Sequence, residues 1–196
     1  IGWRPDVIHC HDWQTGLIPV YLKDRFRGGE FFANMKSVMT IHNLKFQGVW
    51  DVKTIQRFSM LPDYYFTPDK LEAYKDGNML KGGIVFADAI TTVSQTYAEE
   101  IKMPFYGEGL DGLMRARSGD LRGIVNGIDY DEFNPETDKL IAQPYNAKNF
   151  RKEKAKNKKA LQQELGLPVD EKKFMVGIVS RLTDQKGLDL IQCVMD

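Results

Sequence analysis

The chain has 196 residues, enough for one well-filled core or two partial ones. Hydrophobic residues make up 42% and charged residues 28%, a balance that is typical of folded globular proteins and argues against disorder. The 27 basic side chains are matched by 27 acidic ones, so net charge gives no reason to expect nucleic acid or an anionic membrane as a partner. No apolar run approaches the roughly 20 residues that span a bilayer.

The cysteines and the chain ends indicate the redox environment and the extent of the chain. Cys10 and Cys193 lie far apart and form no CxxC pair, which argues against a disulfide framework or a zinc motif. We therefore expect a reduced, cytoplasmic setting. The chain starts without Met at the approach to a strand and stops within a helical pattern, so we expect an internal piece of a longer protein.

Residues 1–125 alternate between strand and helix patterns. Short apolar runs predict strands, each followed by an amphipathic segment that predicts a helix. One helix contains the pair Gly82 and Gly83, which we expect to serve close packing, and another is expected to be capped by Ser94. The expected strands are 6–11, 36–42, 89–94 and 121–125, and the expected helices are 15–26, 51–60 (weak), 78–88 and 95–103.

Composition changes after the fourth strand. The sequence NGID at 126–129 predicts a tight turn, and a Lys-rich segment at 146–159 has few apolar residues. Glu153 interrupts the basic run and aromatic residues are not interleaved, so a solvated helix face, continuing into a helix at 157–165, is favoured over a nucleic-acid patch. We predict an α/β protein in which 1–135 belongs to a first domain, 136–170 is a linker with a connecting helix, and 171–196 begins a second domain.

The second domain would open on a strand that runs into a cationic turn. Residues 174–179 are apolar or small, which predicts a buried strand, and a polar turn with Arg181 and Lys186 precedes a helical pattern. Ligands of open α/β sheets bind beyond the carboxyl ends of the strands, and two cations suit a diphosphate. On this stretch alone, a purely structural turn with Arg181 paired to a surface carboxylate remains an equal alternative.

Polar residues also follow the strands of the first domain. Asp12 follows the first strand, His42 and Asn43 follow the second, and Asn126 follows the fourth. We expect them to face one crevice, where neutral groups would bind sugar hydroxyls. A nucleoside diphosphate gains negative charge as its bond to a sugar breaks, so fixed cations stabilise the transition state without any metal or other cofactor. The predicted reaction class is glycosyl transfer from a nucleotide sugar.

Two other motifs admit different interpretations. His9 and His11 alternate on one strand and could hold a metal, or His9 could be packed in the core with only His11 at the strand end. Asp129 and Asp131 form a DxD motif, for which turn chemistry is favoured over metal binding. Phosphate-loop, GxSxG and complete GxGxxG motifs are absent from the sequence, which argues against kinase, hydrolase and dinucleotide-binding functions.

Taken together, the motifs closely resemble those of bacterial and plant-type glycogen and starch synthases, the ADP-glucose-dependent enzymes of glycosyltransferase family 5. The resemblance is collinear and covers nearly the whole chain. Its segments are HCHDWQTGL at 9–17, TIHNLKFQG at 40–48, LKGGIVFADAITTVS at 80–94, YGEGLDGL at 106–113, NGID at 126–129 with NPETD at 134–138, and SRLTDQKGLDL at 180–190.

The resemblance implies a GT-B architecture of two Rossmann-like domains and a retaining transfer of glucose from ADP-glucose to an α-1,4-glucan. It implies that Arg181 and Lys186 grip the donor diphosphate, that Asp12 and His42 are active-site residues with His42 near the glucose, and that Asn126 belongs to the donor site. A plastid would be the location in a plant.

The family's glycine-rich KxGGLxD loop would precede this stretch and its C-terminal glutamate would follow it, so the stretch by itself is expected to be inactive. A non-catalytic glucan-binding or regulatory module and another GT-B nucleotide-sugar transferase are the alternatives. The oligomeric state is left open.

Overall fold

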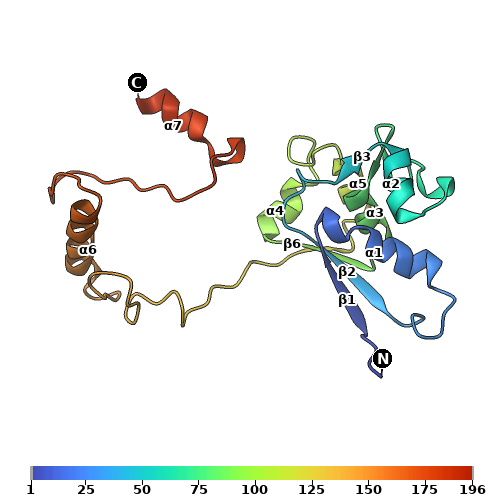
Figure 1. Cartoon of the computed structure of the whole chain (residues 1–196), viewed down its shortest axis with the longest axis horizontal. Coiled ribbons are helices and arrows are strands. Elements are labelled where there is room, and N and C mark those ends of the chain that lie inside the picture. Colours follow the sequence, from blue (N-terminus) through green and yellow to red (C-terminus); the bar gives the residue numbers. More distant parts are fainter. Residues whose placement is uncertain (1, 196) are drawn as a thin grey trace. The chain divides into compact units, whose positions relative to one another are not determined.

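The structure is a computed structural model that describes residues 2–195 (Figure 1). These residues divide into two compact units, with the boundary between Gly127 and Ile128. Unit 1 comprises residues 2–127 and unit 2 comprises residues 128–195. The predicted domain limits at 135 and 170 remain a proposal about the longer protein.

A four-stranded parallel sheet organises unit 1. Its strand order is β1-β2-β6-β7, and Figure 1 shows β1, β2 and β6 running side by side. All three neighbouring pairs are parallel, with His11 opposite Thr40 on β2 and Thr40 opposite Thr91 on β6. The predicted α/β class and the four predicted strands are therefore confirmed, with slightly shorter ends. Their bounds are β1 Val7–His11, β2 Lys36–Ile41, β6 Ala89–Thr92 and β7 Leu121–Gly123.

Helices follow the strands as the periodicity predicts, and side-chain caps begin several of them. The side chain of Asn78 accepts a hydrogen bond from the backbone of Lys81, and Ser94 accepts one from Tyr97, as expected for that cap. The single helix expected at 15–26 is instead composite, because a 3₁₀ turn and a π turn flank its short α-helical part. The helices of unit 1 are α1 Leu17–Val20, α2 Val52–Ser59, α3 Met79–Phe86, α4 Gln95–Glu100 and α5 Asp111–Ala116.

Glycines let α3 approach α1 closely. A Cβ atom on Gly16 would lie 2.1 Å from the carbonyl oxygen of Met79, and one on Gly83 would lie 3.1 Å from the Cα of Gly16. Gly16 has an α-helical φ of −60°, which any residue can adopt. Glycine is required there because a side chain would clash with Met79. The expectation that the glycines of α3 serve close packing is confirmed.

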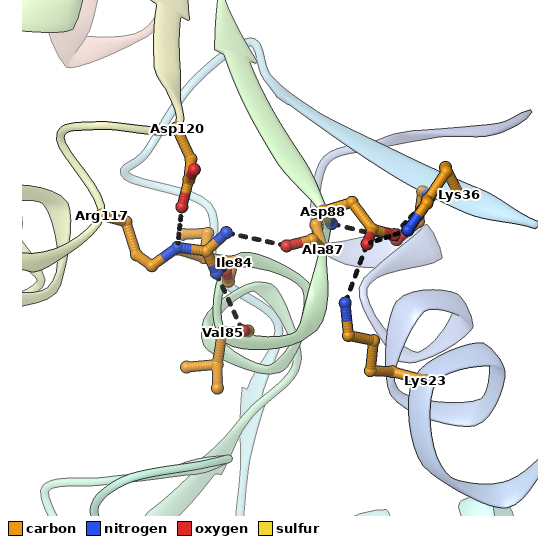
Figure 2. Close-up of polar contacts among 9 residues, drawn as sticks. Lys23, Lys36, Ile84, Val85, Ala87, Asp88, Arg117 and Asp120 are labelled. Carbon is orange, nitrogen blue, oxygen red and sulfur yellow. Dashed lines mark hydrogen bonds and ion pairs between the residues drawn. The ribbon is translucent and has the colours of Figure 1, made fainter. Parts of the chain in front are cut away.

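Two charged side chains fix the junction between α3 and β6 (Figure 2). Arg117 donates to the carbonyl oxygens of Ile84, Val85 and Ala87 at 2.5, 2.8 and 2.7 Å, which caps the end of α3. Asp88, the residue before β6, accepts hydrogen bonds from Lys23 and from the backbone of Ser37 on β2. Burial alone would raise the pKa of the Asp88 carboxyl, but the bonds from Lys23 and Ser37 and the nearby lysines hold it below its ordinary value.

Unit 1 also contains a second, antiparallel sheet of three very short strands, which the sequence patterns did not predict. Its order is β3-β5-β4, and Val49 of β3 pairs with Asn78 of β5. Strands of two or three residues are too short to show a period in sequence. The bounds are β3 Val49–Trp50, β4 Glu72–Ala73 and β5 Asp76–Asn78.

The core of unit 1 consists of two hydrophobic clusters. The first lies on the parallel sheet and includes Cys10, Met39, Ile41 and Ile90, all fully buried. The second gathers residues of α1 and α2 with those of the segment before α3, including Tyr65. Alternate residues of each strand thus face the core, and the others are free to carry polar side chains at the opposite face.

Unit 2 contains two helices, α6 Phe150–Glu164 and α7 Leu188–Met195. The first begins seven residues earlier than expected at 157, because Lys, Glu and Ala in the basic run are themselves good helix formers. The predicted strand at 174–179 is wrong: this segment is largely exposed and pairs with no strand among residues 2–195, and a strand needs a neighbour for its backbone hydrogen bonds.

The tight turn expected at 126–129 is also wrong. Gly127 does not take the positive φ that such an Asn-Gly turn needs, and the turn begins at Asp129. The carboxylate of Asp129 accepts hydrogen bonds from the backbones of Asp131 and Glu132, which is the turn chemistry expected for the DxD motif. These bonds hold the pKa of Asp129 below its ordinary value. No helix described in either unit is long and apolar enough to cross a membrane.

Candidate functional site

Asp12 stands at the carboxyl end of β1 in a strained backbone conformation. Its φ is 53° and its ψ is −170°, a region that L-residues rarely occupy. Hydrogen bonds of its backbone and its side chain hold it there. Its N–H donates to the carbonyl of Thr40 at 3.0 Å, its carbonyl accepts from the N–H of Thr15 at 3.3 Å, and its carboxylate accepts from the N–H of His42 at 2.8 Å. The carboxylate therefore ties the ends of β1 and β2 together.

The three histidines of the chain gather at the same place. Nδ1 of His11 lies 3.0 Å from Nε2 of His42, and the ring centroids of these two residues are 5.2 Å apart. The rings of His9 and His11 approach to 4.2 Å between centroids. His9 is exposed, so the alternative in which it is packed in the core is wrong. The imidazoles form a row on the polar face of the sheet.

Hydroxyl groups extend this row across the sheet. Nε2 of His9 lies 2.6 Å from the hydroxyl of Thr40, which lies 2.5 Å from the hydroxyl of Thr91 on β6. Partial burial lowers the pKa of His9, and charge on His11 and His42 would lower it further. His9 is therefore predominantly neutral at neutral pH.

The loop after β2 completes the site on this unit. Asn43 accepts a hydrogen bond from the backbone of Lys45 at 3.0 Å. Gln47 donates to the carbonyls of Leu44 and Glu108 at 3.1 and 3.0 Å, which joins this loop to the glycine-rich segment before α5. The loop is therefore fixed at both ends, with Asn43 beside His42.

The ring of Trp13 packs against the same loop at Gly48 and Trp50. The ring of Trp13 packs so closely that a Cβ atom on Gly48 would lie 2.6 Å from it, and Trp50 meets it edge-on with centroids 5.2 Å apart. Gly48 also has a positive φ of 62°, so it satisfies both the turn and the close approach. The residue after Asp12 thus anchors the loop that carries Asn43.

The structure brings together some of the predicted site residues. Asp12, His42 and Asn43 share the carboxyl end of β1 and β2 in unit 1. Asn126 is exposed and lies beyond the end of β7 in the same unit. The sequence analysis did not predict the hydroxyl pair of Thr40 and Thr91. Each of these residues lies on a predicted strand, so the alternation of side chains along the strands was the signal that could have placed both on the polar face.

The two predicted cations belong to unit 2. Lys186 ends a 3₁₀ turn, Asp184–Lys186, and Gly187 follows with a left-handed φ of 65°. Arg181 lies just before this turn, and both side chains belong to exposed residues. Gly187 thereby changes the chain direction directly after Lys186 and leads into α7. The 3₁₀ turn thus joins an irregular segment to α7, and the diphosphate role of Arg181 and Lys186 stays a prediction.

Metal binding finds no support in the side-chain arrangement. Among residues 2–195, no group of three or more His, Cys, Asp and Glu side chains is placed to hold a metal ion. Nδ1 of His11 is taken up by His42, and Nε2 of His9 by Thr40.

A sequence profile described as the starch synthase catalytic domain matches residues 1–116, which is more than half of the chain. The chain belongs to this family. The predicted resemblance is thereby confirmed, and the matched range contains Asp12, His42 and Asn43.

Full-length relatives agree with this family assignment. The chain is 71% identical over 196 residues to the glycogen synthase of Lachnoclostridium phytofermentans and 72% identical to that of Lachnospira eligens, covering all of this chain and 41% of each relative. It is 54% identical over 193 residues to the glycogen synthase of Thermotoga maritima, covering 98% of this chain and 39% of that protein. The chain thus spans about two fifths of the length of these curated relatives.

A solved structure of the starch synthase family has the same fold. The catalytic domain of starch synthase IV from Arabidopsis thaliana, bound to ADP and acarbose, matches with a TM-score of 0.88 and 34% identity. The match covers 99% of this chain and 40% of that one. The predicted GT-B type of α/β fold is therefore confirmed.

Proposed function

We propose that the chain is part of a retaining glucosyltransferase that transfers glucose from ADP-glucose to the non-reducing end of an α-1,4-glucan such as glycogen or starch. The observation that carries the proposal is the strained Asp12 whose carboxylate holds the backbone of His42, in a chain that belongs to the starch synthase catalytic domain family. Strain of this kind persists only where the surroundings enforce it, and it clusters at functional sites.

The residues of unit 1 would bind and orient the sugar. Asp12 would fix the end of β2, His42 would lie near the transferred glucose, and Asn43 would offer its side chain beside it. Asn126 would contribute to the donor site. These are hydrogen-bonding groups, which suit hydroxyls that must be held in one orientation while the glycosidic bond is exchanged.

Arg181 and Lys186 would bind the diphosphate of the donor. As the bond between glucose and ADP breaks, the β-phosphate gains negative charge, and fixed cations stabilise that charge more in the transition state than in the ground state. The αL conformation of Gly187 supports this role, because it sets the direction of the turn that carries Lys186. The reaction transfers a glucosyl group and changes no oxidation state, so the proposal includes no redox cofactor.

The choice of donor and the location are also proposals. The ADP named for the Arabidopsis starch synthase IV structure supports an adenine nucleotide as the leaving group. We infer a cytoplasmic location, or a plastid in a plant, where ADP-glucose and glucan would be the only partners that the site requires.

The test is a transfer assay on the full-length protein with ADP-glucose, UDP-glucose and glycogen. We expect ADP release and glucan growth with ADP-glucose, and much slower turnover with UDP-glucose. Retention on immobilised glycogen without ADP release would support a non-catalytic glucan-binding module instead. Transfer to fructose or to a glucose phosphate in place of glycogen would indicate another GT-B nucleotide-sugar transferase.

A further inference from the structure

All three histidines of this protein lie in one contiguous row, His9 to His11 to His42. Only the last of them follows the second strand, at the candidate site. The other two sit on β1, and the backbone of His11 is itself pinned by Thr15, whose hydroxyl accepts from the His11 N–H at 2.6 Å and donates to the His11 carbonyl at 2.8 Å. His11 is thus the fixed member next to His42.

A hydrogen bond between two neutral imidazoles needs one N–H and one lone pair. Since Nδ1 of His11 faces Nε2 of His42 at 3.0 Å, the proton of one ring decides the tautomer of the other. If Nε2 of His42 carries the proton, Nδ1 of His42 is an acceptor. If Nδ1 of His11 carries the proton instead, Nε2 of His42 accepts it and Nδ1 of His42 is a donor. Either arrangement leaves His42 with one defined nitrogen available to a ligand.

Three neighbouring polar side chains, Asp12, Thr40 and Thr91, make their hydrogen bonds elsewhere. The carboxylate of Asp12 accepts from the backbone N–H of His42 and so fixes the chain, not the imidazole. The hydroxyl pair of Thr40 and Thr91 reaches the row through His9, at the end away from His42. The ring of His42 has its hydrogen-bond contact with His11.

We propose that His11 is a positioning residue for His42: through the Nδ1–Nε2 hydrogen bond it fixes the ring plane of His42 and occupies its Nε2, which leaves Nδ1 of His42 for a ligand, with His9 stacked behind. The catalytic consequence rests on the proposed function, because it requires His42 to lie beside the transferred glucose; the coupling of the two rings does not. His11 itself need not touch the substrate.

The direct test is nuclear magnetic resonance of the imidazole nitrogens in the 196-residue chain. With three histidines in the sequence, each variant removes one ring signal and so assigns the spectrum. We expect Nε2 of His42 to show the chemical shift of a hydrogen-bonded imidazole nitrogen in the wild type, to lose that shift in His11→Phe, and to regain most of it in His11→Asn, whose amide offers a polar atom near the former Nδ1 position. His9→Phe is the matched control, because it removes the ring nitrogens of the neighbouring histidine and leaves the His11–His42 bond in place. An unchanged chemical shift of His42 Nε2 in a folded His11→Phe chain would overturn the proposal.

The kinetic test uses the full-length protein. We expect His11→Phe to lower kcat about five- to tenfold, the worth of one hydrogen bond, with KM for ADP-glucose changed less than about twofold. His11→Asn should restore most of kcat, and the melting temperatures of both variants should match the wild type. An unchanged kcat in His11→Phe would overturn the catalytic role of the coupling. If no donor supports transfer by the wild type, the proposed function fails, while the nitrogen spectra still decide whether His11 positions His42.

Discussion

The carboxylate of Asp12 accepts a hydrogen bond from the backbone N–H of His42 at 2.8 Å. The bond links the ends of two neighbouring parallel strands at the edge of the sheet where ligands of α/β folds bind. It also requires the unusual backbone of Asp12, because an extended residue at that position would direct its side chain elsewhere. The geometry of the site is therefore held by a conformation that costs about 1–3 kcal/mol.

Substitutions of Asp12 separate the carboxylate from the backbone strain. Asp12→Ala loses the hydrogen bond and keeps the strained φ of 53°, whereas Asp12→Gly loses the bond and relieves the strain. We expect the Gly variant to be more stable than the Ala variant by about 1–3 kcal/mol in urea unfolding. Tryptophan fluorescence suits the measurement, since Trp3, Trp13 and Trp50 all lie in unit 1.

Asp12→Asn is the control for that comparison, because it keeps a side-chain oxygen that can accept from His42 and leaves the backbone strain unchanged. We expect it to be more stable than Asp12→Ala. Equal stability of the Ala and Gly variants would mean that Asp12 is unstrained in solution.

Arg117 holds the end of α3 through three carbonyl oxygens (Figure 2). Arg117→Met leaves those carbonyls without their donor, so we expect a loss of about 2–4 kcal/mol in the free energy of unfolding. Arg117→Lys should recover little, because an ammonium group lacks the planar fork that reaches several acceptors. The matched control is Arg115→Met, which removes a half-exposed arginine paired with Asp111 and should cost about 1 kcal/mol or less. A loss for Arg117→Met as small as that of the control would contradict a capping role.

Gly16→Ala tests the close approach of α1 and α3. The added Cβ would lie 2.1 Å from the backbone oxygen of Met79, which cannot move without shifting α3, so we expect a destabilisation of about 3 kcal/mol or more in urea. Gly119→Ala is the matched control, since nothing lies within 4 Å of its added Cβ, and it should be neutral or slightly stabilising. Equal effects of the two substitutions would show that the helices separate readily.

The hydrogen-bonded pair of Asp24 and Tyr65 should make the free energy of unfolding of unit 1 fall at both low and high pH. Hydrogen bonds from Tyr64 and Tyr65 hold the pKa of Asp24 below its ordinary 3.8, so its contribution is present above that pH and is lost as pH falls through its folded value. Burial, together with the bond to Asp24, raises the pKa of Tyr65 above its ordinary 10.0, so its contribution is present below pH 10.0 and declines as pH rises further.

Urea midpoints recorded across pH check both limits. We expect Asp24→Asn to lose less stability than the wild type on acidification below 3.8, and Tyr65→Phe to lose less above 10.0. Identical pH profiles for wild type and both variants would show that the pair is not formed.

In the full-length protein, Lys186→Ala should lower kcat on the order of 100-fold, as expected when one group that stabilises developing charge is removed. Lys159→Ala, which removes an exposed lysine of α6, is the control and should leave kcat unchanged. Circular dichroism should show both variants folded. Undiminished turnover of Lys186→Ala would refute the diphosphate role.

The sequence was sufficient for the parallel sheet, because apolar runs such as 36–41 and 89–92 are bounded by polar strand ends. It also placed Asp12, His42 and Asn43 together, because parallel strands end at one edge. It could not show the strain of Asp12, since φ depends on the contacts that enforce it. The capping by Arg117 was equally hidden, because its partners are backbone carbonyls about 30 residues away, and carbonyls carry no residue signature.

Two predictions on unit 2 failed for a related reason. The strand at 174–179 has a convincing apolar pattern, but a strand exists only when a neighbour supplies its hydrogen bonds, and that neighbour is not identified by the pattern itself. The helix expected at 157–165 begins earlier, at Phe150, because Lys, Glu and Ala at 151–156 have high helix propensity although the stretch has little apolar periodicity.

The unpaired apolar stretch at 174–179 has a consequence for handling the protein. Six consecutive uncharged residues, FMVGIV, with free backbone groups match the kind of sequence that stacks into intermolecular cross-β ribbons. Copies of the 196-residue chain would be expected to recruit one another through this stretch as concentration rises. The two lysines before it, at 172 and 173, are balanced by Asp170 and Glu171, and the whole chain has no net charge, so charge repulsion does not keep copies apart and low protein concentration is the condition under which the chain should stay dispersed.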